Sequence, residues 1–124
     1  MGKTVGWILS GLLASLLFMS AGFKLVDWPK KAEEFEKIGF TIELMSKIGV
    51  LEIIITILFL IPRTSFVGAI LLTGYLGGAT VTHLRIGEPF IPPVVIGILL
   101  WTALGLRNSA IFPLAIGKSN PTPK

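Results

Sequence analysis

The stretch "VGWILSGLLASLLFMSAGF", residues 5–23, is a run of 19 residues without a single charged side chain. A helix needs about 20 predominantly apolar residues to cross the hydrocarbon core of a bilayer. The apolar region of a secretory signal peptide is shorter, at about 7–15 residues. The length of the run, and the apolar character of the chain that follows it, therefore predict a retained transmembrane helix.

The composition of the whole chain is that of a membrane protein. Of its 124 residues, 52% are hydrophobic and only 15% are charged, and the mean hydropathy is +0.83. Soluble domains are about 25% charged. We expect a single domain over residues 1–124, because chains of this length seldom divide further.

Four apolar segments are long enough to be membrane spans, at about residues 5–24, 42–61, 65–84 and 92–106. Only helices and closed barrels satisfy their backbone hydrogen bonds inside lipid. These continuous apolar runs lack the alternation typical of barrel strands. The sequence therefore predicts an all-α integral membrane protein, a bundle of four transmembrane helices.

A polar stretch, "DWPKKAEEFEKIGF", separates the first two spans at residues 27–40. Asp27 is a plausible N-cap and Gly39 a plausible terminator for a short helix. Apolar residues recur in it at helical spacing: Trp28, Ala32, Phe35 and Ile38. The pattern predicts an amphipathic helix at the membrane interface. A solvated linker is the alternative.

The basic residues and the chain ends bear on topology. With four spans, both termini and the turn "PRTS" at 62–65 lie on one side, which carries Lys and Arg but no acidic residue. The positive-inside rule then favours cytoplasmic termini, and we expect the inner membrane of a bacterium as the location. We expect the tail, residues 107–124, to be partly disordered.

The charge and the residue inventory exclude several function classes. The net charge is +4, but the 11 Lys and Arg residues are scattered without a basic stripe, which is typical of membrane-flanking charge and not of nucleic-acid binding. The absence of cysteine excludes disulfides and thiol chemistry. A single histidine without cysteine does not make a metal site.

Small residues predict where helices pack closely. Gly74 and Gly78 form a GxxxG pattern in the third span, and Ser10 and Ala14 repeat the small-residue spacing in the first. Such residues let helix backbones approach in lipid. We favour packing inside the bundle, which would make the third span interior. Homodimerisation is the alternative.

Polar residues inside the spans are expected to converge on the side opposite the termini. Lys24 ends the first span, Glu52 comes early in the second, and His83 ends the third. Tyr75 precedes His83 by eight residues, or about 12 Å of helix. Intramembrane charges are costly and usually face protein or water, so we expect Lys24, with Ser20 on its stripe, and Glu52 to face the interior.

Two interpretations of this convergence stay open. Lys24 and Glu52 could be a structural ion pair, since burying either alone would cost far more. Alternatively, they form the polar end of a binding cavity with His83 and Tyr75 on one wall. Trp101 could form another wall, although packing is the favoured role for it. For Arg85 we favour snorkelling to the membrane interface over membership of a site.

Three stretches together resemble the DoxX family, especially its DoxX-like branch. They are "SAGFKL" at 20–25, "IGVLEIIITILFLIP" at 48–62 and "GYLGGATVTHLRIGEP" at 74–89, and the similarity extends from about residue 5 to 106. The resemblance implies a small integral membrane protein of four helices. The positions that fall on the family's recurring pattern are Ser20, Gly22, Lys24, Glu52, Pro62, Gly78, His83 and Arg85.

The resemblance implies less about activity. Named members are associated with quinone-linked sulfur oxidation or membrane oxidoreductase complexes, and a distant eukaryotic relative is a receptor-assembly chaperone. We expect a module without catalysis of its own and with no required cofactor, which binds a lipid, a quinone or another small amphiphile, a partner subunit or a second copy. The alternatives are a quinone-site subunit of an oxidoreductase complex and a small proton-coupled exporter.

Overall fold

The structure, a computed structural model, describes residues 1–117, and this part of the chain is helical without strands. The expectation of an all-α protein is confirmed. The helices are α1 (Gly2–Leu25), α2 (Lys31–Lys37), α3 (Ile42–Leu60), α4 (Ser65–Arg85), α5 (Ile91–Arg107) and α6 (Ile111–Ala115). The short helix α6 was not expected, and the disorder predicted for the last residues of the tail concerns positions outside the described ones.

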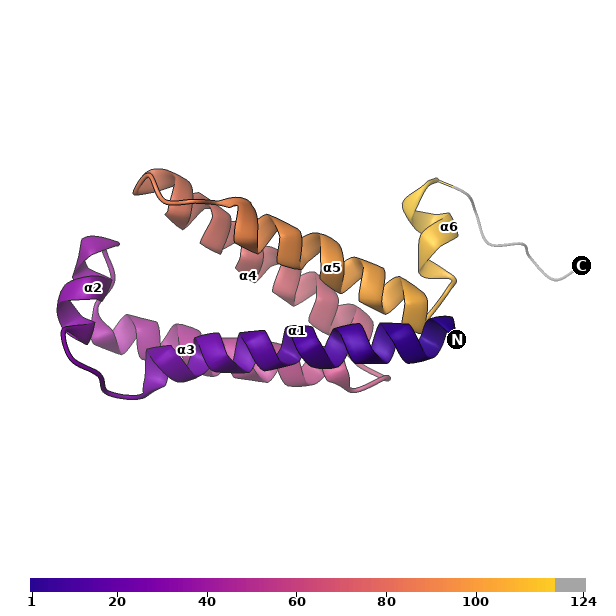
Figure 1. Cartoon of the computed structure of the whole chain (residues 1–124), viewed down its shortest axis with the longest axis horizontal. Helices are drawn as coiled ribbons and strands as arrows, with labels where there is room; N and C mark the ends of the chain where they lie inside the picture. Colours follow the sequence, from indigo (N-terminus) through magenta and orange to yellow (C-terminus); the bar gives the residue numbers. More distant parts are fainter. Residues whose placement is uncertain (118–124) are drawn as a thin grey trace, which may run out of the picture.

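The four long helices are arranged as two layers (Figure 1). Helix α1 packs against α3 and α5, and α4 packs against the same two helices. The layer of α1 and α3 and the layer of α4 and α5 meet at the end that holds the N-terminus. They diverge toward the end that holds α2, so the molecule has a closed end and an open end.

The closed end holds the apolar core, and two glycines allow the layers to meet there. A methyl group on Gly68 of α4 would lie 2.4 Å from the backbone nitrogen of Phe59 in α3. A methyl group on Gly6 of α1 would lie 2.9 Å from the carbonyl oxygen of Ala103 in α5. Both distances are shorter than a real contact, so only glycine permits these approaches. The core around them includes Leu13, Leu17, Phe59, Leu72, Leu100 and Leu104.

The predicted helix contact at Gly74 and Gly78 is wrong for contacts inside this chain. Both residues are exposed, and no atom lies within 4 Å of the position that a methyl group would take on either. They lie on the part of α4 where the layers have already separated, so α4 is not an interior helix. The alternative use of this pattern, contact with a second copy, stays a prediction.

The connection between α1 and α3 contains a helix, as predicted, but its start differs. Lys30, with a φ of 63°, stands at the N-cap of α2 where Asp27 was expected. On the predicted apolar face Phe35 is buried and Trp28 packs edge-on against it at 5.8 Å, whereas Ala32 is exposed. Gly39 follows the helix with a φ of +86°, which favours glycine.

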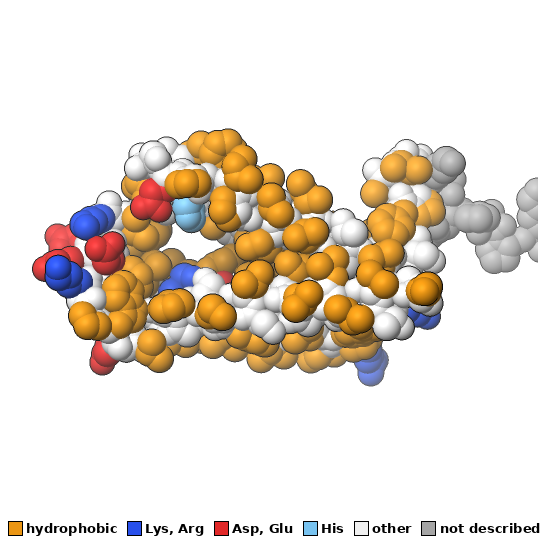
Figure 2. Space-filling view, in the orientation of Figure 1, with side chains coloured by type: hydrophobic (Ala, Val, Ile, Leu, Met, Phe, Trp, Pro, Cys, Tyr) orange, Lys and Arg blue, Asp and Glu red, His pale blue; other side chains and the backbone are white. Residues whose placement is uncertain are grey.

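Two of the helices, α1 and α4, are long and apolar enough to cross a bilayer. Helix α5 is apolar but shorter, and α3 carries Glu43, Lys47 and Glu52. Large hydrophobic side chains are exposed on all four long helices, and in Figure 2 they cover the sides of the molecule. The apolar helices fit a membrane protein, and the count of four spans stays a prediction.

Candidate functional site

The open end of the molecule contains a cleft of about 580 Å³ between the two helix layers. We call it the interlayer cleft. Its walls are mostly apolar side chains of the four long helices, and the connection between α2 and α3 contributes Ile38 and Phe40. The hollow is visible in Figure 2, with a cationic side chain deep inside it and the histidine at its upper edge.

An ion pair lies on the α1–α3 side of this cleft. The Lys24 ammonium is 2.9 Å from the Oε1 atom of Glu52, and the two side chains are 14% and 1% exposed. The Tyr75 hydroxyl donates a hydrogen bond of 2.9 Å to the same oxygen. Ser20 donates to it at 3.4 Å. Of the residues predicted to converge, the structure joins Lys24, Glu52 and Tyr75 but not His83; with Ser20 these three are here called the polar cluster.

The sequence around Glu52 explains how the pair forms. Glu52 lies on a stripe of α3 whose other members, Gly49, Thr56 and Phe59, are all buried. A methyl group on Gly49 would lie 3.0 Å from Cβ of Lys24, so this glycine lets α3 approach α1 one turn before the carboxylate. Sequence reasoning expected Glu52 to face the interior but did not identify Gly49 as the residue that permits this approach.

His83 lines the interlayer cleft but makes no hydrogen bond to the polar cluster. Its Nδ1 atom is 2.7 Å from the carbonyl oxygen of Ala79. A carbonyl can only accept, so Nδ1 carries the proton, and Nε2 of the neutral ring is an acceptor. Eight residues, or about 12 Å of helix, separate His83 from Tyr75 along the same helix.

Arg85 makes a hydrogen bond at the open end of the molecule. Its Nη2 atom donates a hydrogen bond of 2.7 Å to the carbonyl oxygen of Ile38, which follows α2. The contact joins the end of α4 to the α2–α3 connection, 47 positions away in the chain. Arg85 is exposed and is not among the residues that line the interlayer cleft, so its snorkelling to the membrane interface stays a prediction, and its guanidinium has in addition a partner within the chain.

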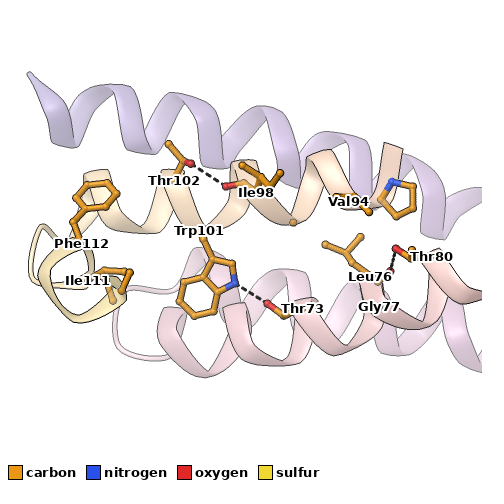
Figure 3. A pocket seen from close by; sticks show the side chains of 13 residues that line it. Thr73, Leu76, Gly77, Thr80, Val94, Ile98, Trp101, Thr102, Ile111 and Phe112 are labelled. Atoms are coloured by element: carbon orange, nitrogen blue, oxygen red, sulfur yellow. Dashed lines mark hydrogen bonds between the residues drawn. The ribbon is translucent and has the colours of Figure 1, made fainter. Parts of the chain in front are cut away.

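Trp101 does not form a wall of the interlayer cleft. It lines a second cavity of about 590 Å³, the outer groove, between α4 and α5, with α6 at one end (Figure 3). Its Nε1 atom donates a hydrogen bond of 2.8 Å to the Thr73 hydroxyl, and its ring packs against Phe66. Thr73 and Thr80 donate to carbonyls of their own helix. The polar side chains of Trp101, Thr73 and Thr80 are thus bonded within the chain, and Trp101 packs against the core and Phe66, in line with the packing role favoured for it.

Sequence reasoning missed the role of Arg107, which was counted only as a membrane-flanking charge. The residue is 9% exposed, and its guanidinium lies 3.8 Å above the Trp7 ring. Its Nη1 atom donates to the Ser10 hydroxyl at 3.2 Å and to the Phe59 carbonyl at 3.0 Å. Arg107 therefore joins α1, α3 and α5 at the closed end. In the sequence, Arg107 is a cation directly after an apolar run. An exposed residue at the membrane boundary has the same pattern, so the sequence could not distinguish the two.

Comparison with known proteins assigns the chain to a family. No curated protein and no solved structure matches the chain. The model of one family, described as the DoxX-like family, matches residues 8–104. This range contains most of α1, all of α2, α3 and α4, and the greater part of α5, and it includes the polar cluster, His83 and Arg85. The chain therefore belongs to the DoxX-like family of membrane proteins.

Proposed function

We propose that the interlayer cleft binds a small amphiphile, such as a lipid or a quinone, and that the chain is a membrane module without catalysis of its own. One observation supports this most directly: an apolar cleft open between two helix layers contains a buried polar cluster. Ligand pockets are typically apolar clefts of 300–1,000 Å³ with a few polar groups that orient the ligand.

We propose further that α1, α3, α4 and α5 all cross the membrane. The 19 residues of α3 extend about 28 Å and the 17 residues of α5 about 25 Å, close to the 30 Å of a bilayer core. Glu43 and Lys47 lie in the first turns of α3, where they would reach the interface. The Lys24 ammonium compensates the charge of the Glu52 carboxylate. In this arrangement the closed end faces the cytoplasm, with the N-terminus.

Binding is favoured over chemistry because the polar side chains of the cleft are bonded to one another. Lys24, Ser20 and Tyr75 all direct their donors to the Glu52 carboxylate. Such a network can orient a head group without a nucleophile and base being poised for reaction. A proton-coupled exporter is disfavoured, since its carboxylate must gain and lose protons, and proton uptake by Glu52 would break the bonds that it accepts from Lys24, Tyr75 and Ser20.

The test is the occupancy of the cleft, measured by native mass spectrometry of protein released from mild detergent. Gly78 lines the interlayer cleft and Gly77 lines the outer groove, and neither has an atom within 4 Å of its methyl position. Gly78→Leu should fill the cleft, and Gly77→Leu is the matched control. We expect a bound amphiphile in the wild type and in Gly77→Leu but not in Gly78→Leu. An equal amount in all three proteins would refute the proposal.

A second candidate is a quinone site within a larger oxidoreductase complex. Tyr75 and His83 lie on the same helix and line the same cleft, but the Tyr75 hydroxyl already donates to Glu52 and His83 Nδ1 to the Ala79 carbonyl, so a quinone carbonyl would have to displace one of these bonds. Difference spectra on addition of a short-chain quinone, recorded for the wild type and His83→Ala, test this candidate. Identical spectra would remove it, whereas the amphiphile site would stand.

A further inference from the structure

We infer that the interlayer cleft selects an uncharged amphiphile whose head group donates hydrogen bonds, that is, a hydroxyl-bearing head. The inference rests on the proposed function and follows from the donors and acceptors that the polar cluster leaves available to a ligand. Each side chain has a fixed number of both, so the ones already used within the chain can be subtracted.

The ammonium donors of Lys24 are fully used. An ammonium has three N–H groups. Those of Lys24 reach the Ser20 hydroxyl at 2.7 Å, the Ser20 carbonyl at 3.4 Å and Glu52 Oε1 at 2.9 Å. An anionic or carbonyl head group would therefore have to break a bond of this ammonium before it could form one.

The hydroxyl donors of the cluster are used as well. Tyr75 and Ser20 each have one O–H group, and both donate to Glu52 Oε1. Their oxygens keep lone pairs, so toward a ligand these side chains are acceptors. No donor of the polar cluster is left for a ligand that can only accept.

Acceptor capacity, in contrast, remains on both walls. All the contacts that Glu52 receives from side chains of residues 1–117 end on Oε1. The Oε2 atom receives none, yet no buried side-chain oxygen of these residues is left without a partner. Oε2 therefore keeps a small accessible surface, on a side chain that is 1% exposed and that lines the cleft. On α4, Nδ1 of His83 is used on the Ala79 carbonyl, so Nε2 is the ring nitrogen left for a ligand, and in a neutral imidazole it is an acceptor.

The charge of the cleft favours a neutral head group. Lys24 and Glu52 form a 1:1 pair, and among residues 1–117 no other Asp, Glu, Lys or Arg lines the cleft. A charged head group would lose its hydration without gaining a counter-ion, which is unfavourable in an apolar site. A hydroxyl loses less hydration free energy than a charged group when it enters the cleft, and it finds hydrogen-bond acceptors there. The residues thus favour an alcohol over an acid, an amine, an ester or an ether of the same chain length.

A matched set of ten-carbon probes tests this selection: 1-decanol, decyl methyl ether, decanoate and decylamine. Dissociation constants would be measured in detergent by native mass spectrometry. One net hydrogen bond is equivalent to about tenfold in affinity. We expect decanol to bind at least about tenfold more tightly than the ether and than either charged probe, and to lose its binding in Gly78→Leu but not in Gly77→Leu.

A second variant replaces the acceptor that the polar cluster offers to a ligand by a donor. Lys24→Met/Glu52→Gln removes both charges together and places an amide N–H donor where Oε2 was. We expect the preference for decanol over the ether to fall to about onefold. Equal binding of decanol and ether to the wild type, or tighter binding of decanoate, would overturn the inference but leave the amphiphile site standing. Binding of no probe, or binding unaffected by Gly78→Leu, would overturn the proposed function as well.

Discussion

Replacing Glu52 by leucine should destabilise the protein far more than its single lost ion pair suggests. The change leaves the Lys24 ammonium, 14% exposed, without its counter-ion and the Tyr75 hydroxyl without its acceptor. Breaking a buried pair from one side costs about 3–5 kcal/mol. An orphaned hydroxyl costs about 1–3 kcal/mol more. We expect a loss of about 4–8 kcal/mol, near the lower limit because Lys24 borders the open cleft.

The double variant Lys24→Met/Glu52→Leu should recover most of this loss. Both charges are then absent, and only the Tyr75 and Ser20 hydroxyls lose their hydrogen-bond acceptor. We therefore expect the double variant to be about 1–3 kcal/mol less stable than the wild type. The difference between the double and the single variant measures the cost of the unpaired ammonium. If Glu52→Leu alone yields no folded protein, recovery of the fold in the double variant carries the same information.

The assay is the loss of helical circular dichroism as sodium dodecyl sulfate is added to protein in mild detergent micelles. The matched control is the exposed pair Lys47 and Glu43 on the same helix, 3.5 Å apart with side chains 72% and 82% exposed. Its removal should change stability by no more than about 0.5 kcal/mol. The reasoning is refuted if Glu52→Leu is as stable as the wild type, or if the double variant is no more stable than the single one.

Four further substitutions test other parts of the structure by the same unfolding assay or by hydrogen exchange. Gly68→Ala should cost about 1–3 kcal/mol because its methyl group meets the α3 backbone, whereas Gly74→Ala should be neutral or stabilising by up to about 1 kcal/mol. A reversed order would show that the layers do not meet at Gly68. Arg85→Ala should speed amide exchange in residues 39–41 without a large loss of stability, and unchanged exchange would contradict its contact with the Ile38 carbonyl. Arg107→Met should cost about 1–3 kcal/mol by leaving the Phe59 carbonyl without its side-chain donor, and wild-type stability would show that the buried guanidinium contributes nothing.

The positions of the helices could be predicted from the sequence because apolar run length and helix-terminating residues are local signals. The start of α5 at two prolines and the end of α2 before Gly39 are of this kind. The convergence of Lys24, Glu52 and Tyr75 was also predictable, since chain direction and helix rise place them at the same depth. Predicting this shared depth did not require knowing which helices contact one another.

Close helix contacts could not be predicted in the same way. The sequence contains glycines in several helices, and nothing in it separates Gly74 and Gly78 from Gly6, Gly49 and Gly68. The latter three lie at close approaches between helices, whereas Gly74 and Gly78 do not. A glycine permits a close approach but does not create a partner, and the partner depends on where the two layers meet.

Local sequence patterns were sufficient to predict that this chain is helical and apolar, that its polar side chains lie toward one end, and that Lys24 and Glu52 would form an ion pair if both were buried. These properties follow from local composition and from the cost of an unpaired charge away from water. The tertiary structure decided that the layers diverge, so that the ion pair borders a cleft, His83 faces that cleft from across it, and Arg107 is buried at the closed end. Those outcomes depend on the packing of side chains far apart in the chain, and no local pattern encodes the angle between two helix layers.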